Sequence, residues 1–263
     1  MQTSAPTTRS TLQILAIVLA VIWQIGATFL PNFGLGEPIG QRSDAIRTLV
    51  VPSGWAFAIW GPLFLGCAIY AVWQALPGQR DNPLVASIGW YTAGATAANG
   101  LWATYTQFYN LTFISALIIL FSLVCLLATL RALVAWEKPF TKGERWITAL
   151  TFSALAAWLT VASTVNITAA LKYHGVGAGS SYPMLAAAIV LVAGLIGSAA
   201  ATGARGNPWY SVVILWAMLA IYFKGGQEHF AIAVATGLST LMVAFSCLRK
   251  LSGRSDRQHW LGF

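Results

Sequence analysis

Aromatic and amide side chains recur at helical spacing in three long apolar stretches of the sequence. The three groups are Trp60 and Phe64 in the first stretch, Asn99 and Trp102 in the second, and Trp158, Ala162 and Asn166 in the third. Within each group the spacing places the members on one face of a helix. An indole has a flat apolar face and one N–H donor, and an amide has both donors and an acceptor. If the three groups converge, they form an uncharged cavity for a large, planar, mostly apolar ligand.

These residues also have a purely structural interpretation. An amide inside an apolar helix is costly unless it is paired, and a pair with a neighbouring helix contributes about 1 kcal/mol in a membrane. Asn166 therefore either joins two helices or contacts a ligand, and one amide can do both. Aromatic stripes at helical spacing likewise often serve only to pack helices together. Spacing alone does not decide between packing and binding.

Several kinds of reactive site are missing from the sequence. All seven acidic residues lie in predicted loops or at helix ends, where they cannot form a proton relay within the membrane. The histidines, His174, His229 and His259, lie outside the long apolar stretches and supply no pair of haem ligands. There is no HExxH motif and no phosphate-binding glycine loop. We therefore expect no catalytic residue, no metal site and no enzymatic activity.

The composition is that of a membrane protein. Hydrophobic residues make up 57% of the 263 residues, charged residues only 8%, and the mean hydropathy is +0.70. A soluble domain usually has about 25% charged residues, so this chain cannot form a surface that faces water throughout. The net charge of +8 comes from basic residues in short loops and near the C-terminus. That placement favours contact with lipid head groups over binding of nucleic acid.

Eight apolar stretches are long enough to cross a bilayer, which requires about 20 residues for each helix. They cover residues 11–30, 54–76, 84–107, 111–135, 145–171, 183–203, 208–224 and 228–248. Residues 31–52 read as a polar loop, and Asn82 is placed to cap the third helix. Of the 12 tryptophans, Trp136, Trp146, Trp209 and Trp260 lie at predicted helix ends, where indoles favour the head-group level. The predicted fold class is an all-α membrane protein.

The basic residues predict an orientation. With a cytoplasmic N-terminus and eight spans, the cytoplasmic side holds Arg9, Arg80, Arg131, Lys138, Lys142, Arg145, Arg205, Arg249, Lys250, Arg254 and Arg257. The opposite side holds only Arg42, Arg47, Lys172 and Lys224. This asymmetry follows the positive-inside rule, and an odd number of spans would place one terminal cluster on the wrong side. We expect a bacterial-type inner membrane and cytoplasmic termini.

The segment PSGWAFAIWGPLF at residues 52–64 resembles the signature of the tryptophan-rich sensory protein (TspO/MBR) family, which includes the translocator proteins. The residues that match it are Pro52, Trp55, Phe57, Trp60, Leu63 and Phe64. The segment containing Asn99 and Trp102 resembles the third helix of that family. The segment containing Trp158, Ala162, Ser163 and Asn166 resembles its fifth. The three matching segments occur in the order of the family.

This resemblance implies a fold and a ligand. Residues 1–176 would form the five-helix TspO-like bundle, and residues 177–263 would add three transmembrane helices and a basic C-terminal tail. Members of the family bind porphyrins, and some bind sterols, in a pocket between helices. By resemblance, the ligand-binding residues are Trp55, Trp60, Phe64, Asn99, Trp102, Trp158, Ala162 and Asn166. A bound porphyrin or other tetrapyrrole is the one cofactor that the resemblance implies.

Three functions remain open at this point. The first is a membrane protein that binds a tetrapyrrole or similar hydrophobic ligand for sensing, regulation or transport. The second is a passive or exchange transporter of small amphipathic solutes, and the third is breakdown of a porphyrin in light. The expected partners are the ligand, the lipid bilayer and, in a homo-oligomer, further copies of the chain. The three additional helices could pack against the bundle, cover its lipid-facing entry or replace a contact between two copies.

Overall fold

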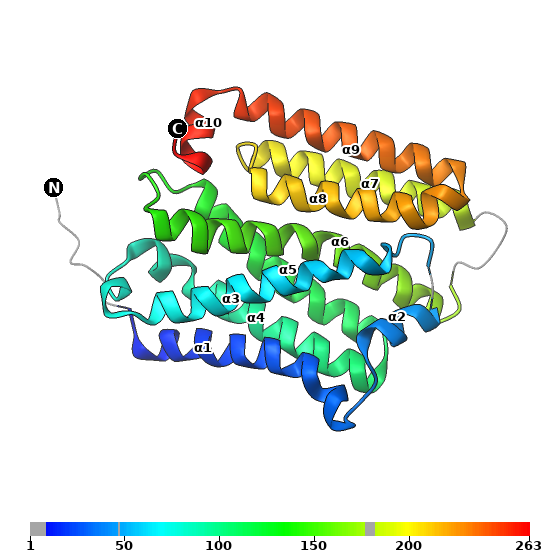
Figure 1. Ribbon diagram of the computed structural model, residues 1–263, viewed down its shortest axis with the longest axis horizontal. Coiled ribbons are helices and arrows are strands. Elements are labelled where there is room, and N and C mark those ends of the chain that lie inside the picture. Colours follow the sequence, from blue (N-terminus) through cyan, green and yellow to red (C-terminus); the bar gives the residue numbers. More distant parts are fainter. Residues whose placement is uncertain (1–8, 47, 177–181) are drawn as a thin grey trace.

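The computed structural model describes residues 9–46, 48–176 and 182–263, and this part of the chain is helical without any strand (Figure 1). The long helices of the first half are α1 (Thr11–Gly26), α3 (Trp60–Ala75), α4 (Pro83–Tyr109), α5 (Phe113–Val134) and α6 (Leu150–Tyr173). Those of the second half are α7 (Tyr182–Gly203), α8 (Pro208–Ile221) and α9 (Phe230–Leu251). Each predicted span coincides with one of these helices. The predicted all-α membrane fold is confirmed.

Short 3-10 or π-helical segments extend four of these helices. They are η1 (Ala27–Phe33) after α1, η2 (Gly54–Ile59) before α3, η4 (Glu144–Ala149) before α6 and η5 (Tyr222–Gly226) after α8. A further 3-10 turn, η3 (Pro77–Gln79), precedes α4, and Asn82 caps that helix as predicted, with its Oδ1 3.1 Å from the amide nitrogen of Val85. Pro62 lies in the first turn of α3, a position where proline is tolerated.

Seven helices of the described chain are long and apolar enough to cross a membrane, and α4 falls short in apolarity alone. At 27 residues, α4 is amply long for a bilayer. Its polar residues, among them Thr92, Thr96 and Gln107, are buried against α1 and α5, so they face protein instead of lipid. Because α4 lies within the bundle alongside the spanning helices, we count it as the eighth span (Figure 1).

The helices form two groups that lie side by side (Figure 1). Helices α1, α3, α4, α5 and α6 pack as one bundle, and α7, α8 and α9 pack as a second group against α6. The Tyr210 hydroxyl of α8 lies 3.1 Å from the hydroxyl of Thr160 in α6. Asn207, which caps α8, donates to the hydroxyl of Ser153 at 2.7 Å. The predicted division at residues 176 and 177 lies at the edge of the described residues.

Two predicted irregular segments are in part helical. Within the predicted polar loop lies α2 (Ile39–Ile46), and Arg47, which follows it, is outside the described residues. The predicted C-terminal tail contains α10 (Arg254–Leu261), which folds back onto the bundle. Trp260, predicted at a helix end, does not present its indole to lipid head groups, because the ring is completely buried and donates to the carbonyl oxygen of Ala204 at 3.0 Å. Trp146, in contrast, is 51% exposed.

The beginning of α1 and the end of α9 lie at the same end of the bundle (Figure 1). This arrangement requires an even number of crossings, in agreement with eight spans. Arg9 lies at this end and is buried, with its guanidinium donating to Gln13, to the backbone of Gln74 and to the Gln74 side chain. We call it the terminal end, and the opposite one the loop end.

Candidate functional site

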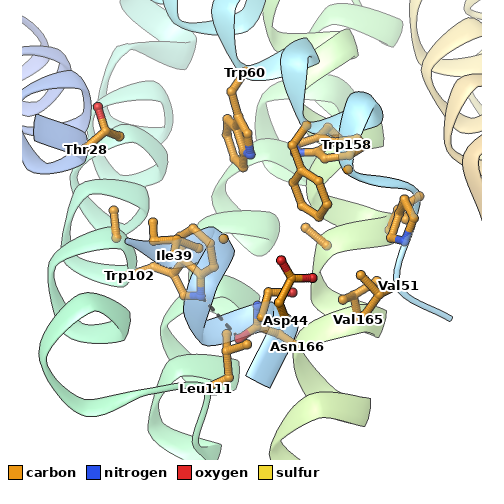
Figure 2. Close-up of a pocket in the computed structure, with 18 of the residues that line it drawn as sticks. Thr28, Ile39, Asp44, Val51, Trp60, Trp102, Leu111, Trp158, Val165 and Asn166 are labelled. Atoms are coloured by element: carbon orange, nitrogen blue, oxygen red, sulfur yellow. Dashed lines mark hydrogen bonds between the residues drawn. The ribbon is translucent and has the colours of Figure 1, made fainter. Parts of the chain in front are cut away.

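A cavity of about 400 Å³ opens within the loop end of the first helix group (Figure 2). Drug-sized ligands typically occupy pockets of about 300–1,000 Å³, so the volume suits an organic molecule. The walls come from α3, α4 and α6, and α2 lies across the space between them. The lining is mostly apolar, with Ile39, Val51, Leu111, Val161 and Val165 among its members.

Three indoles from three helices meet at this cavity. The ring of Trp60 in α3 stacks on that of Trp102 in α4, with centroids 6.4 Å apart and an angle of 24° between planes. Trp158 in α6 meets Trp60 edge-on, with centroids 6.0 Å apart. Phe57 and Phe64 extend the aromatic surface through contacts with Trp158 and Trp60. The result is a flat-walled hollow and not a set of rings directed at lipid.

Asn166 links two helices and still has a free donor. Its Oδ1 accepts from Trp102 Nε1 at 3.2 Å (Figure 2). It also accepts from Ser115 Oγ at 3.0 Å, so Asn166 joins α6 to both α4 and α5. Its Nδ2 makes no hydrogen bond within the described residues, so the amide can still donate to a ligand. The packing and binding interpretations of this residue are therefore compatible.

Two other side chains of the lining carry buried nitrogens without a partner in the described chain. Asn99 uses its Oδ1 to accept from Gln24 Nε2 at 3.2 Å, but its Nδ2 is unpaired. Trp158 is almost fully buried, and its Nε1 is unpaired as well. An unpaired buried donor costs about 1–3 kcal/mol. Both nitrogens have almost no accessible surface, so a ligand recovers that free energy only by a shift of the side chain that brings the donor to the ligand's acceptor.

Seven of the eight residues predicted to bind ligand line this cavity, namely Trp60, Phe64, Asn99, Trp102, Trp158, Ala162 and Asn166. The eighth, Trp55, does not line it. Its ring packs edge-on against Trp216 of α8, with ring centroids 4.8 Å apart, and against Phe223, with ring centroids 6.3 Å apart. Trp55 therefore fastens the second helix group to the first.

Several lining residues were not predicted from the sequence. Gly40, Ser43 and Asp44 come from α2, whose short polar stretch gave no apolar period to recognise. Lys224 comes from η5 in the second helix group, which nothing in the sequence connected to the site. Phe57, in contrast, belongs to the signature segment and could have been included on that ground.

The charged groups lie at the mouth of the cavity. Asp44 is exposed, Lys224 is half-buried, and neither forms an ion pair within the described residues. No group of three or more His, Cys, Asp or Glu side chains that could hold a metal occurs in the described part of the chain. The site can stack, bury and hydrogen-bond a ligand.

The fold and the cavity define a polytopic helical membrane protein with an internal aromatic site. The family model described as TSPO-like protein matches residues 10–249, and the chain belongs to this family. The match takes in α7, α8 and α9 as well as the five-helix bundle. Comparison with curated proteins and with solved structures gave no match.

Proposed function

We propose that this TSPO-like membrane protein binds a planar hydrophobic ligand of the porphyrin or tetrapyrrole type in the cavity at its loop end, in a sensory or regulatory role. The observation that carries the proposal is the convergence of Trp60, Trp102 and Trp158 on a hollow with unpaired amide and indole donors. Stacking and burial supply affinity, and the donors orient polar edges of the ring.

The surroundings of the cavity favour binding over catalysis and over coupled transport. Its only acidic lining residue, Asp44, is exposed, and the lining holds no histidine to act with it as a general acid or base. The spans that line it carry no Asp, Glu, His, Lys or Arg deep inside that could serve as a proton relay. We accordingly propose a non-enzymatic protein, with light-dependent porphyrin breakdown as a measurable exception.

The basic residues at the terminal end favour insertion with that end in the cytoplasm of a bacterial-type inner membrane. The cavity then lies in the outer half of the bilayer. Labelling of single cysteines with a membrane-impermeant maleimide tests this orientation. Cysteine at exposed Phe33, on the loop end, reacts from outside, and cysteine at exposed Lys138 does not.

Titration of purified protein in nanodiscs with protoporphyrin tests binding, followed by the visible absorbance of the porphyrin. We expect saturable binding at one site and a loss of at least about tenfold in affinity for the double variant Trp102→Ala, Asn166→Ala, because stacking and a polar anchor are both removed. Trp146→Ala, which changes an exposed indole away from the cavity, is the matched control. Equal affinity in the double variant and the control contradicts the proposed site.

Flux measurements separate binding from passive transport. If the protein only binds, proteoliposomes loaded with protoporphyrin are expected to release it no faster than liposomes that contain no protein. Accelerated release that the double variant abolishes would instead establish the transporter function. Incubation of the bound porphyrin in darkness and in light, followed by chromatography, detects any breakdown.

A further inference from the structure

Lys224 brings a cation from the second helix group to the ligand cavity of the first. It lies in the π-helical turn η5, directly after α8, and belongs to the lining although the other lining residues precede residue 167. Its side chain is half-buried and forms no ion pair within the described residues. Single π-helical turns are frequent at functional sites, where they re-aim side chains.

The backbone of η5 and α8 is held against the segment that forms the rim of the cavity. A Cβ at Gly225 would lie 2.5 Å from the carbonyl oxygen of Leu49, so only glycine allows this approach. Ser53 donates through both its amide and its hydroxyl to the carbonyl oxygen of Ala220, at 3.1 and 3.0 Å. Trp216 Nε1 donates to the carbonyl oxygen of Ala56 at 3.2 Å. The position of Lys224 is thus fixed by several contacts.

The lining side chains include three nitrogens without a partner in the described chain, and all three are donors. They are Asn166 Nδ2, Asn99 Nδ2 and Trp158 Nε1, and the last two lie in the wall with almost no accessible surface. Lys224 adds a positive charge at the mouth, and an ammonium has three donors and no acceptor. Asp44 is the one anionic lining residue, and it is exposed, so water screens its charge. A complementary ligand has acceptors along its ring and an anionic group at one edge.

We infer that the second helix group completes the ligand site, with Lys224 binding a carboxylate on an otherwise planar and apolar ligand. The inference rests on the proposed function and narrows its ligand class to planar carboxylic acids. It also gives α8 and α9 a role in binding, because both helices contact η5.

Two probes with the same ring separate charge from shape. Protoporphyrin IX carries two carboxylates, and its dimethyl ester carries none. In nanodiscs of neutral lipid, we expect Lys224→Gln to weaken binding of the diacid about fivefold and to leave the ester unchanged, the scale of a partly exposed ion pair. We expect Lys224→Arg to restore the affinity for the diacid, and Asp44→Asn to raise that affinity slightly. Lys172→Gln, which alters an exposed cation of the loop end outside the cavity lining, is the matched control.

The outcomes are distinct. Selective loss of the diacid in Lys224→Gln, reversed by Lys224→Arg, supports the inference. Equal weakening of both probes assigns Lys224 a structural role and overturns it, as does unchanged binding of both. If the unaltered protein binds neither probe, the proposed function itself fails.

Discussion

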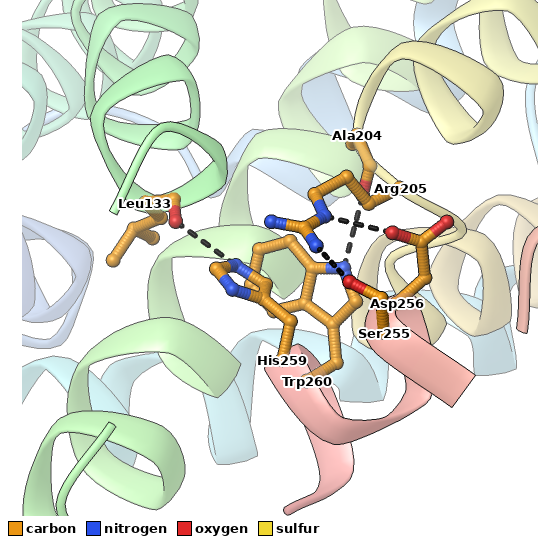
Figure 3. Close-up of polar contacts among 7 residues, drawn as sticks. All are labelled: Leu133, Ala204, Arg205, Ser255, Asp256, His259 and Trp260. Carbon is orange, nitrogen blue, oxygen red and sulfur yellow. Dashed lines mark hydrogen bonds and ion pairs between the residues drawn. The ribbon is translucent and has the colours of Figure 1, made fainter. Parts of the chain in front are cut away.

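The two helix groups meet at both ends of the molecule: α10 links them at the terminal end, and a ligand-sized cavity adjoins their contact at the loop end (Figure 1). At the terminal end, α10 joins them through paired groups (Figure 3). At the loop end, the groups enclose a cavity in which three donors have no protein partner. The terminal end also has buried polar atoms without a partner in the described chain, Trp136 Nε1, Arg145 Nε and Trp209 Nε1 among them, so the two ends differ in the cavity and not in the pairing of every polar group.

The pairing at the terminal end involves every polar side chain drawn in Figure 3. Arg205 lies 2.8 Å from the carboxylate of Asp256 and donates to the hydroxyl of Ser255 at 2.9 Å. Trp260 Nε1 donates a hydrogen bond to the carbonyl oxygen of Ala204, which follows α7 of the second group. His259 Nε2 lies 3.1 Å from the carbonyl oxygen of Leu133, at the end of α5 in the first group. Polar groups that are hydrogen-bonded to each other stabilise a contact, whereas an unpaired group can still form a hydrogen bond with a ligand.

The largest expected effect is on the stability of the terminal end. Trp260→Ala removes a fully buried indole, and we expect the free energy of unfolding to fall by about 4 kcal/mol. Denaturant unfolding in micelles measures it, with Trp146→Ala as the exposed control. A loss as small as that of the control would mean that α10 does not secure the two groups.

At the loop end, the same kind of change is expected to act on binding. Trp158→Phe keeps an aromatic ring but removes the unpaired N–H, so the fold loses no hydrogen bond within the described residues. We expect the affinity for protoporphyrin dimethyl ester to fall about tenfold, the value of one good hydrogen bond. Absorbance titration measures it. Unchanged affinity would indicate that this donor does not face the ligand.

The terminal end is also expected to respond to acid. Burial, followed by the charge of Arg205 and then of Arg145, lowers the pKa of His259 to about 4, although the Leu133 carbonyl and Asp256 act in the opposite direction. Between pH 6.5 and 4 the unfolded chain binds a proton that the folded chain does not, so stability falls as the pH falls through this window. Unfolding measured across it should be less pH-dependent for His259→Gln. An equal slope would exclude His259 as the source.

The smallest expected effect separates the charged groups of the two ends. Asp256→Asn breaks an ion pair whose side chains are 31% and 23% exposed, and we expect a loss of stability of about 1 kcal/mol or less, reduced further by salt. Asp44→Asn, at the loop end, breaks no ion pair within the described residues and should leave stability unchanged. Equal losses in the two variants would remove the distinction between the ends.

The spans and most of the cavity could be predicted because they follow from periodic signals. A membrane helix needs a long apolar stretch, and residues on one of its faces recur at three and four positions. Trp102 and Asn166 were identified in this way, and the structure joins them by a hydrogen bond. The cap at Asn82 was predictable for a similar reason, since it depends only on neighbouring residues.

The remaining features depend on contacts between distant segments. Lys224 reaches the cavity because Gly225 permits a close approach to Leu49, and no local pattern encodes that approach. Trp55 shares the signature segment with Trp60 but packs on Trp216 of the other helix group. Trp260 lies in a short polar helix, and its indole is buried because it contacts the backbone of Ala204, a residue far away in the sequence. Sequence spacing identifies a face of a helix but not the element opposite it.

Lys224 and the cavity belong to one polypeptide, so they stay together however few copies of the protein the membrane contains. Were the cation supplied by a separate chain, site occupancy would fall as the two components were diluted in the lipid. A covalent connection instead holds the cation at a fixed effective concentration, independent of copy number. A single molecule in a sparsely populated membrane therefore has every binding group that the structure provides.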